Sequence, residues 1–149
     1  MSESTVKTPT SVQMRRVFNT SPAALFQAWT DPQLLAQWFH PTAQHASSVP
    51  ILELHEGGRY QIVMHAGEND HTVGGVYQTV EPSKKLVFTW QWGHEPEIAE
   101  MLVTVEFNAL EDNKTELVLL HERFPHEEER DSHEWGWNGT FEQLEAFIE

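Results

Sequence analysis

Residues 86–92 read LVFTWQW, and this stretch decides the fold class of the chain. Every second residue, from Leu86 through Phe88 and Trp90 to Trp92, is large and apolar. Alternate side chains of a β-strand lie on the same face of its sheet. The stretch therefore predicts a strand with one face of large rings packed on the interior of the protein.

The same alternation continues on both sides of this stretch. The predicted strands are residues 12–18, 51–55, 59–65, 76–80, 86–92, 101–107 and 115–124. Gly57-Gly58, Gly74-Gly75 and the polar residues 111–114 are predicted turns between them. Strands joined by such short turns favour an antiparallel meander.

Helical signals stand at the two ends of this strand region. Ser21-Pro22 and Asp31-Pro32 each combine a capping side chain with a proline at the first helical position, and predict two short helices after the first strand. Near the C-terminus, Trp137, Phe141 and Leu144 recur at helical spacing. They predict one long amphipathic helix, capped at Asp131 or Ser132.

The order of elements indicates an α+β protein. One C-terminal helix cannot cover six to seven flat strands, so the antiparallel sheet is expected to curve around it. The space between helix and sheet is then a natural place for an apolar cavity, lined by rings from both.

Length and composition limit the class of protein. A chain of 149 residues fits one domain, which we expect at residues 12–149 after a flexible tail of residues 1–11. The absence of Cys excludes disulfides, thiolate metal sites and Cys nucleophiles. A net charge of −14 disfavours nucleic acids and anionic membranes as partners. No signal peptide or membrane-length apolar run is present in the sequence, so we expect a cytoplasmic protein.

Four segments of the sequence resemble a known superfamily. They are residues 17–39 (VFNTSPAALFQAWTDPQLLAQWF), 56–60 (EGGRY), 86–90 (LVFTW) and the region 115–137, with TEL at its start, HERF inside it and GW at its end. In these segments the chain resembles the START-like (SRPBCC) superfamily with its helix-grip fold. Within it, the chain resembles the branch homologous to the C-terminal domain of the heat-shock-protein ATPase activator.

The resemblance implies a cavity under the C-terminal helix. The candidate lining residues are Trp38, Phe39, Tyr60, Met64, Phe88, Trp90, Trp92, Val103, Val105, His121, Trp137 and Phe141. Such aromatic residues fill cores more often than they contact ligands, but in this fold the core and the pocket share one surface.

Three functions are compatible with this superfamily. The first is a binding protein for a small hydrophobic molecule, and the second is a chaperone ATPase activator-like interaction module. The third is a cyclase- or hydrolase-like enzyme that uses His121 with Tyr60 in the pocket. We favour the first, because the many Trp and Phe residues and the fold resemblance together indicate an apolar cavity. The third lacks support, since the sequence contains no paired acid and base and no nucleophile motif.

The histidines do not indicate a metal site. His126, Glu129 and His133 are the best metal-like group, but their spacing matches no zinc motif and a solvated helix start explains them better. His121 is the histidine that the alternation turns inward, and we interpret it as a core residue with a hydrogen-bond partner. Five further histidines, which we expect in loops or outer positions, are His40, His45, His65, His71 and His94. No cofactor or metal is expected, and the sequence carries no signal for an oligomeric state.

Overall fold

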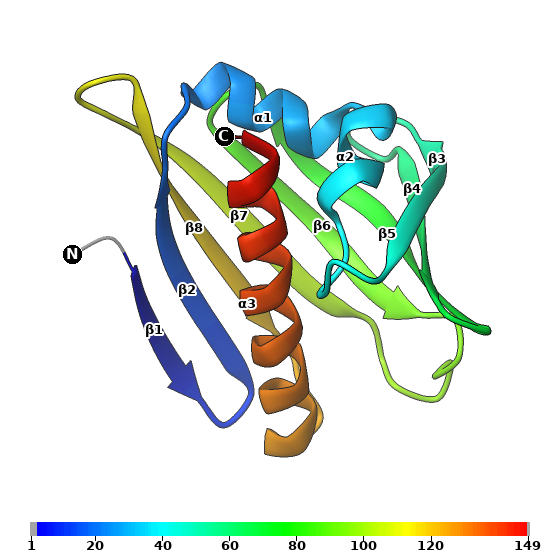
Figure 1. The fold of residues 1–149 in the computed structure, drawn as a ribbon. Helices are drawn as coiled ribbons and strands as arrows, with labels where there is room; N and C mark the ends of the chain where they lie inside the picture. Colours follow the sequence, from blue (N-terminus) through cyan, green and yellow to red (C-terminus); the bar gives the residue numbers. More distant parts are fainter. Residues whose placement is uncertain (1–2, 149) are drawn as a thin grey trace.

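A computed structural model describes residues 3–148 of the chain. In chain order the elements are β1 (Glu3–Thr8), β2 (Ser11–Phe18), α1 (Pro22–Thr30), α2 (Pro32–Trp38), β3 (Ala46–Leu52), β4 (Arg59–Ala66), β5 (Asn69–Glu81), β6 (Lys85–Trp92), β7 (Met101–Leu110), β8 (Lys114–Glu122) and α3 (Glu127–Ile148). The strands form one antiparallel sheet across which α3 lies, with α1 and α2 at one end (Figure 1). This architecture confirms the predicted helix-grip fold, with eight strands in place of six to seven.

The strand order shows how the chain closes around its C-terminal helix. From one edge to the other the sheet runs β1-β2-β8-β7-β6-β5-β4-β3. Strands β3 to β8 form the predicted meander, in which each strand pairs with the next along the chain. The meander is joined to the N-terminal part because β8 pairs with β2, from Ser11 opposite Glu122 to Phe18 opposite Thr115.

The two short helices begin where the sequence predicts. Ser21 caps α1, since its hydroxyl accepts a hydrogen bond from the Ala24 amide at 3.2 Å. Asp31 caps α2 in the same way, accepting from the Gln33 amide at 2.9 Å. Each cap is followed by a proline at the first helical position, where its missing N–H costs nothing.

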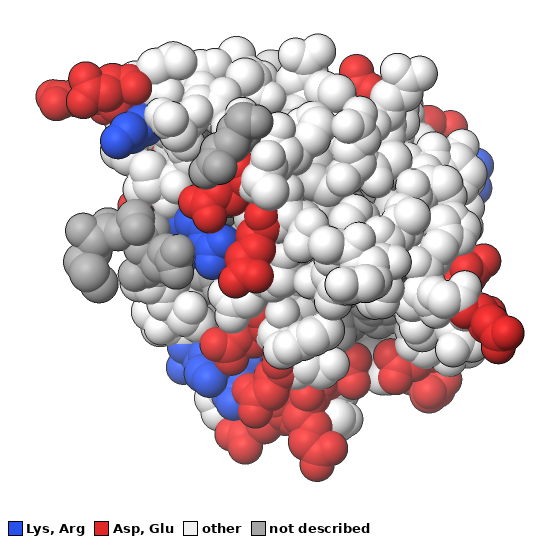
Figure 2. Space-filling model, viewed as in Figure 1, with Lys and Arg blue, Asp and Glu red and all other residues white. Residues whose placement is uncertain are grey.

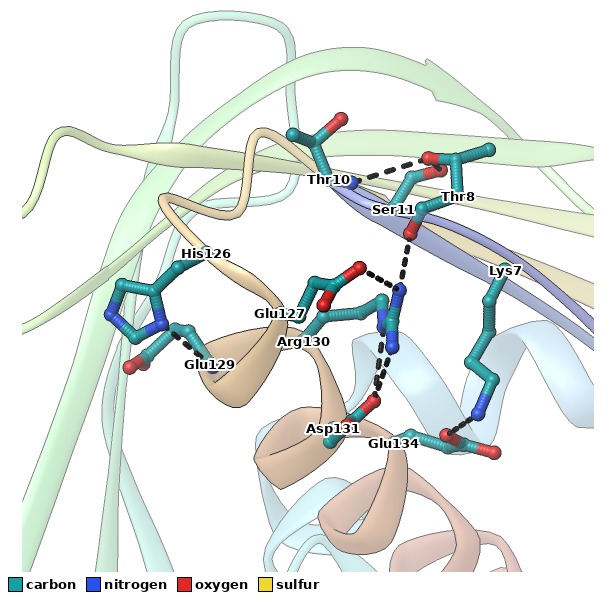
Figure 3. A network of polar contacts seen from close by, with 10 residues as sticks. All are labelled: Lys7, Thr8, Thr10, Ser11, His126, Glu127, Glu129, Arg130, Asp131 and Glu134. Atoms are coloured by element: carbon teal, nitrogen blue, oxygen red, sulfur yellow. Dashed lines mark hydrogen bonds and ion pairs between the residues drawn. The ribbon is translucent and has the colours of Figure 1, made fainter.

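Strand β1 corrects the prediction of an N-terminal tail. Residues 3–8 extend the sheet by pairing with β2 from Glu3 opposite Arg16 to Thr8 opposite Ser11. The start of α3 also contacts the β1–β2 turn (Figure 3). There Arg130 Nη1 donates a hydrogen bond to the Thr8 carbonyl at 2.7 Å, which holds the end of β1 in place. Main-chain pairing needs no apolar side chains, so the polar sequence of residues 1–11 contains no pattern from which this strand could be predicted.

The glycines at positions 74 and 75 form no turn, unlike the pair at 57 and 58. Gly57 has a φ of +86°, which suits the predicted turn before β4. Gly74 and Gly75 instead lie within β5, which is longer than expected. A Cβ on Gly75 would lie 2.1 Å from the Thr89 carbonyl oxygen, so a glycine is required where β5 passes Thr89 of β6.

Helix α3 begins at Glu127, one turn earlier than predicted from Asp131 or Ser132. His126 caps it, because its Nδ1 accepts a hydrogen bond from the Glu129 amide at 3.3 Å. The first turn is acidic, and Figure 2 shows Asp and Glu side chains gathered around this end of the helix. Negative charge at a helix N-terminus complements its dipole. Within residues 3–148, no helix has both the length and the apolar composition needed to cross a membrane.

The core lies between α3 and the concave face of the sheet. On the helix, Trp137, Phe141 and Leu144 are buried at the predicted spacing. Phe141 meets Phe18 of β2 edge-on, with ring centroids 6.1 Å apart. Helix α3 therefore packs firmly on the β2 side of the sheet, and this placement leaves room on the other side.

Candidate functional site

A cavity of about 400 Å³ lies between α3 and the β4–β6 half of the sheet. Its walls come from α3, from β4, β5 and β6, and from the loops that follow α2 and β6. The lining residues are Phe39, Pro41, His45, Met64, Ala66, His71, Trp90, Trp92, His94, Glu95, Glu129, Ser132, His133, Trp135, Gly136, Trp137 and Thr140. None of them belongs to β2, β7 or β8. The cavity thus occupies the part of the concave face that α3 leaves uncovered.

The loop between α2 and β3 closes one side of this cavity against α3. Gly139 makes this approach possible, since a Cβ there would lie 2.1 Å from the Pro41 carbonyl oxygen. Ser47 fixes the other end of the loop by donating to the Phe39 carbonyl at 2.6 Å. At Gly136, one turn earlier, a Cβ would meet no atom within 4 Å, because that position faces the cavity.

Four tryptophans line the cavity. Trp90 contacts two of the others, with ring centroids 5.5 Å from Trp92 and 5.2 Å from Trp137. Trp135 stands apart from this group and is 65% exposed. Buried rings supply a rigid apolar surface, whereas an exposed Trp at the edge of a cavity is available to a ligand or a partner.

Trp92 and His133 are joined by a hydrogen bond between sheet and helix. The Trp92 indole Nε1 donates to His133 Nε2 at 2.8 Å, so this ring nitrogen carries no proton. The proton is therefore on Nδ1, which donates to the Glu129 carbonyl of the preceding turn at 2.8 Å. Both ring nitrogens of neutral His133 are satisfied, and the ring is held in one orientation.

Trp137 and His121 form a second bond of the same kind deeper in the core. The Trp137 indole Nε1 donates to His121 Nδ1 at 3.0 Å, which places the proton of the neutral ring on Nε2. That Nε2–H is buried without an acceptor, as is the indole N–H of Trp90. Neither of these two donors is accessible from the cavity, so neither can bind a ligand in this structure.

Burial keeps both imidazoles neutral. It lowers the pKa of His121 well below its usual range, and the neighbouring His133 lowers it further. Burial also lowers the pKa of His133, although the Glu129 carbonyl and the charge of Glu95 act in the opposite direction. The two rings stand 4.9 Å apart, a separation at which charging both would be strongly unfavourable.

The structure divides the twelve predicted lining residues into three groups. Those that line the cavity are Phe39, Met64, Trp90, Trp92 and Trp137. Tyr60 and Phe88, together with Phe39 and Trp90, line a second void of about 20 Å³, which is large enough for a single water only. The remaining five are packed into the solid core and line neither space, namely Trp38, Val103, Val105, His121 and Phe141.

Helix α3 supplies cavity residues that the sequence analysis missed. They follow the spacing i, i+3, i+4, i+7 and i+11, and are Glu129, Ser132, His133, Gly136 and Thr140. This is a helical face in its own right, beside the apolar stripe of the helix. His133 is buried in it and Glu129 is half-buried, which corrects our interpretation of these two residues as part of an exposed helix start, whereas His126 is exposed as expected.

Three histidines that we expected to lie outside any site stand on the cavity wall. His71 and His94 meet edge-on with ring centroids 5.2 Å apart, and His45 lies on the α2–β3 loop. No period in the sequence brings these three residues together, because each comes from a different segment. Across the described residues, no group of three or more His, Asp or Glu side chains is placed to hold a metal ion.

Tyr60 and His121, the pair considered for catalysis, do not share a cavity. The Tyr60 hydroxyl donates to the Thr89 carbonyl at 2.6 Å, and burial together with Tyr77 raises the pKa of this hydroxyl. No hydrogen bond or ring contact links it to His121, although the structure describes both residues.

The fold and the cavity agree with what the chain is similar to. It belongs to the family described as Activator of Hsp90 ATPase homolog 1-like protein, whose profile matches residues 19–149. This result confirms the branch of the superfamily indicated by the sequence motifs.

Two curated relatives are the Activator of 90 kDa heat shock protein ATPase homolog 1 of Homo sapiens and that of Mus musculus. The chain is 28% and 27% identical to them over 133 residues. This alignment covers 89% of the chain and 35% of each relative, so the chain spans about a third of their length.

Solved structures show the same fold. A protein from Chromobacterium violaceum superimposes with a TM-score of 0.85 at 23% identity, covering 95% of this chain and 98% of that one. The AHSA1 protein from Silicibacter pomeroyi superimposes with a TM-score of 0.78 at 28% identity, covering 91% and 95% respectively.

Proposed function

We propose that this protein binds a small hydrophobic molecule in the cavity between α3 and the β4–β6 half of the sheet. The observation that carries the proposal is the cavity itself. Its volume of about 400 Å³ lies in the range of small-molecule sites, and its walls are mainly apolar and aromatic. Phe39, Trp90 and Trp137 are almost fully buried, so the site is largely formed before a ligand arrives.

A neutral fluorescent probe, N-phenyl-1-naphthylamine, tests this proposal. Its emission rises in apolar surroundings, and we expect a saturable rise with the wild-type protein. The Gly136→Leu variant places a side chain in the cavity without a clash at Cβ, and should weaken probe binding at least about tenfold.

Ala146→Leu is the matched control for the Gly136→Leu variant. Ala146 is an exposed residue of α3 outside the cavity, so the control adds a similar side chain to the same helix and should bind the probe as the wild type does. Absence of probe binding to the wild type, or equal binding by Gly136→Leu, would contradict the proposed site.

A second function follows from the similarity to the human activator. That protein is named for its action on the ATPase of the 90 kDa heat shock protein, and 89% of this chain aligns with part of it. If this chain acts in the same way, the purified protein should bind a 90 kDa chaperone in a pull-down and raise its ATPase rate. An unchanged ATPase rate at saturating protein would exclude this function.

A further inference from the structure

The four cavity tryptophans are suited to more than apolar contact. Trp90, Trp92, Trp135 and Trp137 are four of the six tryptophans in the chain, and all of them line this one cavity. The face of an indole ring carries negative electrostatic potential and attracts cations more strongly than any other aromatic side chain does. A cavity with several indoles can therefore hold a positively charged group as well as a hydrocarbon.

Two carboxylates reach the same cavity from different elements. Glu129 belongs to the first turn of α3, and its Oε2 lies 3.8 Å from His133 Nδ1. Glu95 follows β6, and its charge also acts on His133, raising the pKa of that ring. Glu95 lies beside His94 and Glu129 beside His133, and both imidazoles contact the Trp92 ring, which places the two carboxylates at the same end of the cavity.

These carboxylates are partly withdrawn from water. The side chain of Glu129 is 15% exposed and that of Glu95 is 29% exposed. Partial burial weakens solvent screening, so each charge acts more strongly inside the cavity than it would on the surface.

No Lys or Arg side chain in the cavity lining balances the charges of these two carboxylates. Within residues 3–148, neither carboxylate has a Lys or Arg partner. The imidazole of His94 and the neutral imidazole of His133 lie 3.8 Å from the Glu95 and Glu129 carboxylates, respectively. Figure 2 shows Asp and Glu side chains gathered at the start of α3 with Lys and Arg beside them, and the basic residues there pair with Glu127, Asp131 and Glu134, which do not line the cavity.

We propose that the cavity selects hydrophobic molecules that carry a positive charge, such as an amine or a quaternary ammonium group. The inference rests on the proposed function and defines its ligand class. The hydrocarbon part lies against Phe39, Met64 and Trp90, and the cationic group lies between the two carboxylates and the indole faces. The same charges disfavour anionic ligands, because the lining contains no Lys or Arg to neutralise them.

A series of probes with one ring system and three charges tests this inference. Isothermal titration calorimetry at pH 7.5 would compare 2-naphthylmethylammonium, the neutral 2-naphthalenemethanol and the anionic 2-naphthoate. We expect the ammonium compound to bind at least about tenfold more tightly than the alcohol, and the naphthoate to bind most weakly.

Neutral variants of the two carboxylates identify the source of the preference. Glu95→Gln and Glu129→Gln should each reduce ammonium binding about threefold to tenfold, and reduce binding of the alcohol by a smaller factor. Glu128→Gln is the matched control, because this exposed neighbour removes the same charge outside the cavity lining.

The outcomes separate this inference from the proposed function. Equal binding of the three probes, or tightest binding of the naphthoate, would overturn the cation preference while the cavity remains a hydrophobic binding site. An ammonium preference that survives in the Glu95→Gln/Glu129→Gln double variant would overturn the role of these carboxylates. Failure of all three probes to bind would contradict the proposed function together with the inference.

Discussion

At the scale of single residues, two tryptophan–histidine hydrogen bonds join α3 to the sheet beneath the cavity. Trp92 donates to His133 across the interface, and Trp137 of the helix donates to His121 of β8. In both cases a neutral imidazole is the acceptor, and a protonated ring could not accept the bond. The wall of the cavity therefore depends on keeping these two histidines uncharged.

Acid should weaken the fold through these histidines. Their pKa values are lowered in the folded state, so below about pH 6.5 the unfolded chain binds protons that the folded chain does not. The contribution of the two neutral histidines to the free energy of unfolding is fully present above that pH. It falls as the pH drops, by about 1.4 kcal/mol per pH unit for each histidine. Urea unfolding at pH 7.5, 6.5 and 5.5 measures this slope.

His121→Gln separates the contribution of one ring from that of the carboxylates. Glutamine can accept the Trp137 indole hydrogen bond but does not titrate. The free energy of unfolding should therefore change less steeply between pH 6.5 and 5.5, by about 1.4 kcal/mol per pH unit, which corresponds to one proton. The wild-type slope measured under the same conditions is the reference. An unchanged slope in His121→Gln would show that His121 does not titrate with folding.

At the scale of elements, α3 uses two glycines for opposite purposes. Gly139 allows the α2–β3 loop to approach the helix, whereas Gly136 leaves space at the cavity wall. Both are in the middle of a helix, where glycine costs about 1 kcal/mol relative to alanine. At Gly139 the close approach compensates for that cost, and at Gly136 no contact within the chain does so.

The two glycines should respond to alanine in opposite directions. Gly136→Ala should raise the free energy of unfolding by about 1 kcal/mol, because the helix gains and the new methyl group meets nothing within 4 Å. Gly139→Ala should lower it by about 1–3 kcal/mol, because its methyl group would overlap the Pro41 carbonyl. Urea denaturation of both variants measures the difference, and a loss of stability in Gly136→Ala would contradict the open space at that position.

At the scale of the whole molecule, the charge is strongly unbalanced. The 23 acidic residues outnumber the 9 basic ones, for a net charge of −14. Folding brings these like charges closer together, which opposes the compact state. Among the described residues few of them pair with Lys or Arg, and several of these ion pairs join exposed side chains, such as Arg59 with Glu53.

Salt should therefore stabilise the protein. Raising the NaCl concentration from about 0.01 M to about 0.2 M shortens the screening length from about 30 Å to less than 10 Å, and reduces repulsion throughout the molecule. We expect the urea midpoint at pH 7.5 to rise. KCl at the same concentration should have the same effect, which excludes binding of a particular cation, and a midpoint that falls with salt would contradict this account.

Much of this architecture could be predicted from local patterns in the sequence. The period of two in residues 86–92 and its neighbours identifies the strands, and Ser21-Pro22 and Asp31-Pro32 mark the short helices. The helical spacing from Trp137 to Leu144 identifies α3 and its buried face. These patterns suffice because the period of side chains along one element depends only on that element.

The division of one inner surface into core and cavity was decided by the tertiary structure. The alternation along a strand predicts equally well that Val105 and Trp92 point inward. It does not show which element lies opposite either side chain. Because α3 lies over the β2 side, Val105 is closed by packing and Trp92 is left beside the cavity. The same limit applies to β1, which is held by main-chain pairing, and to His71, His94 and Glu129, which only the folded chain brings together.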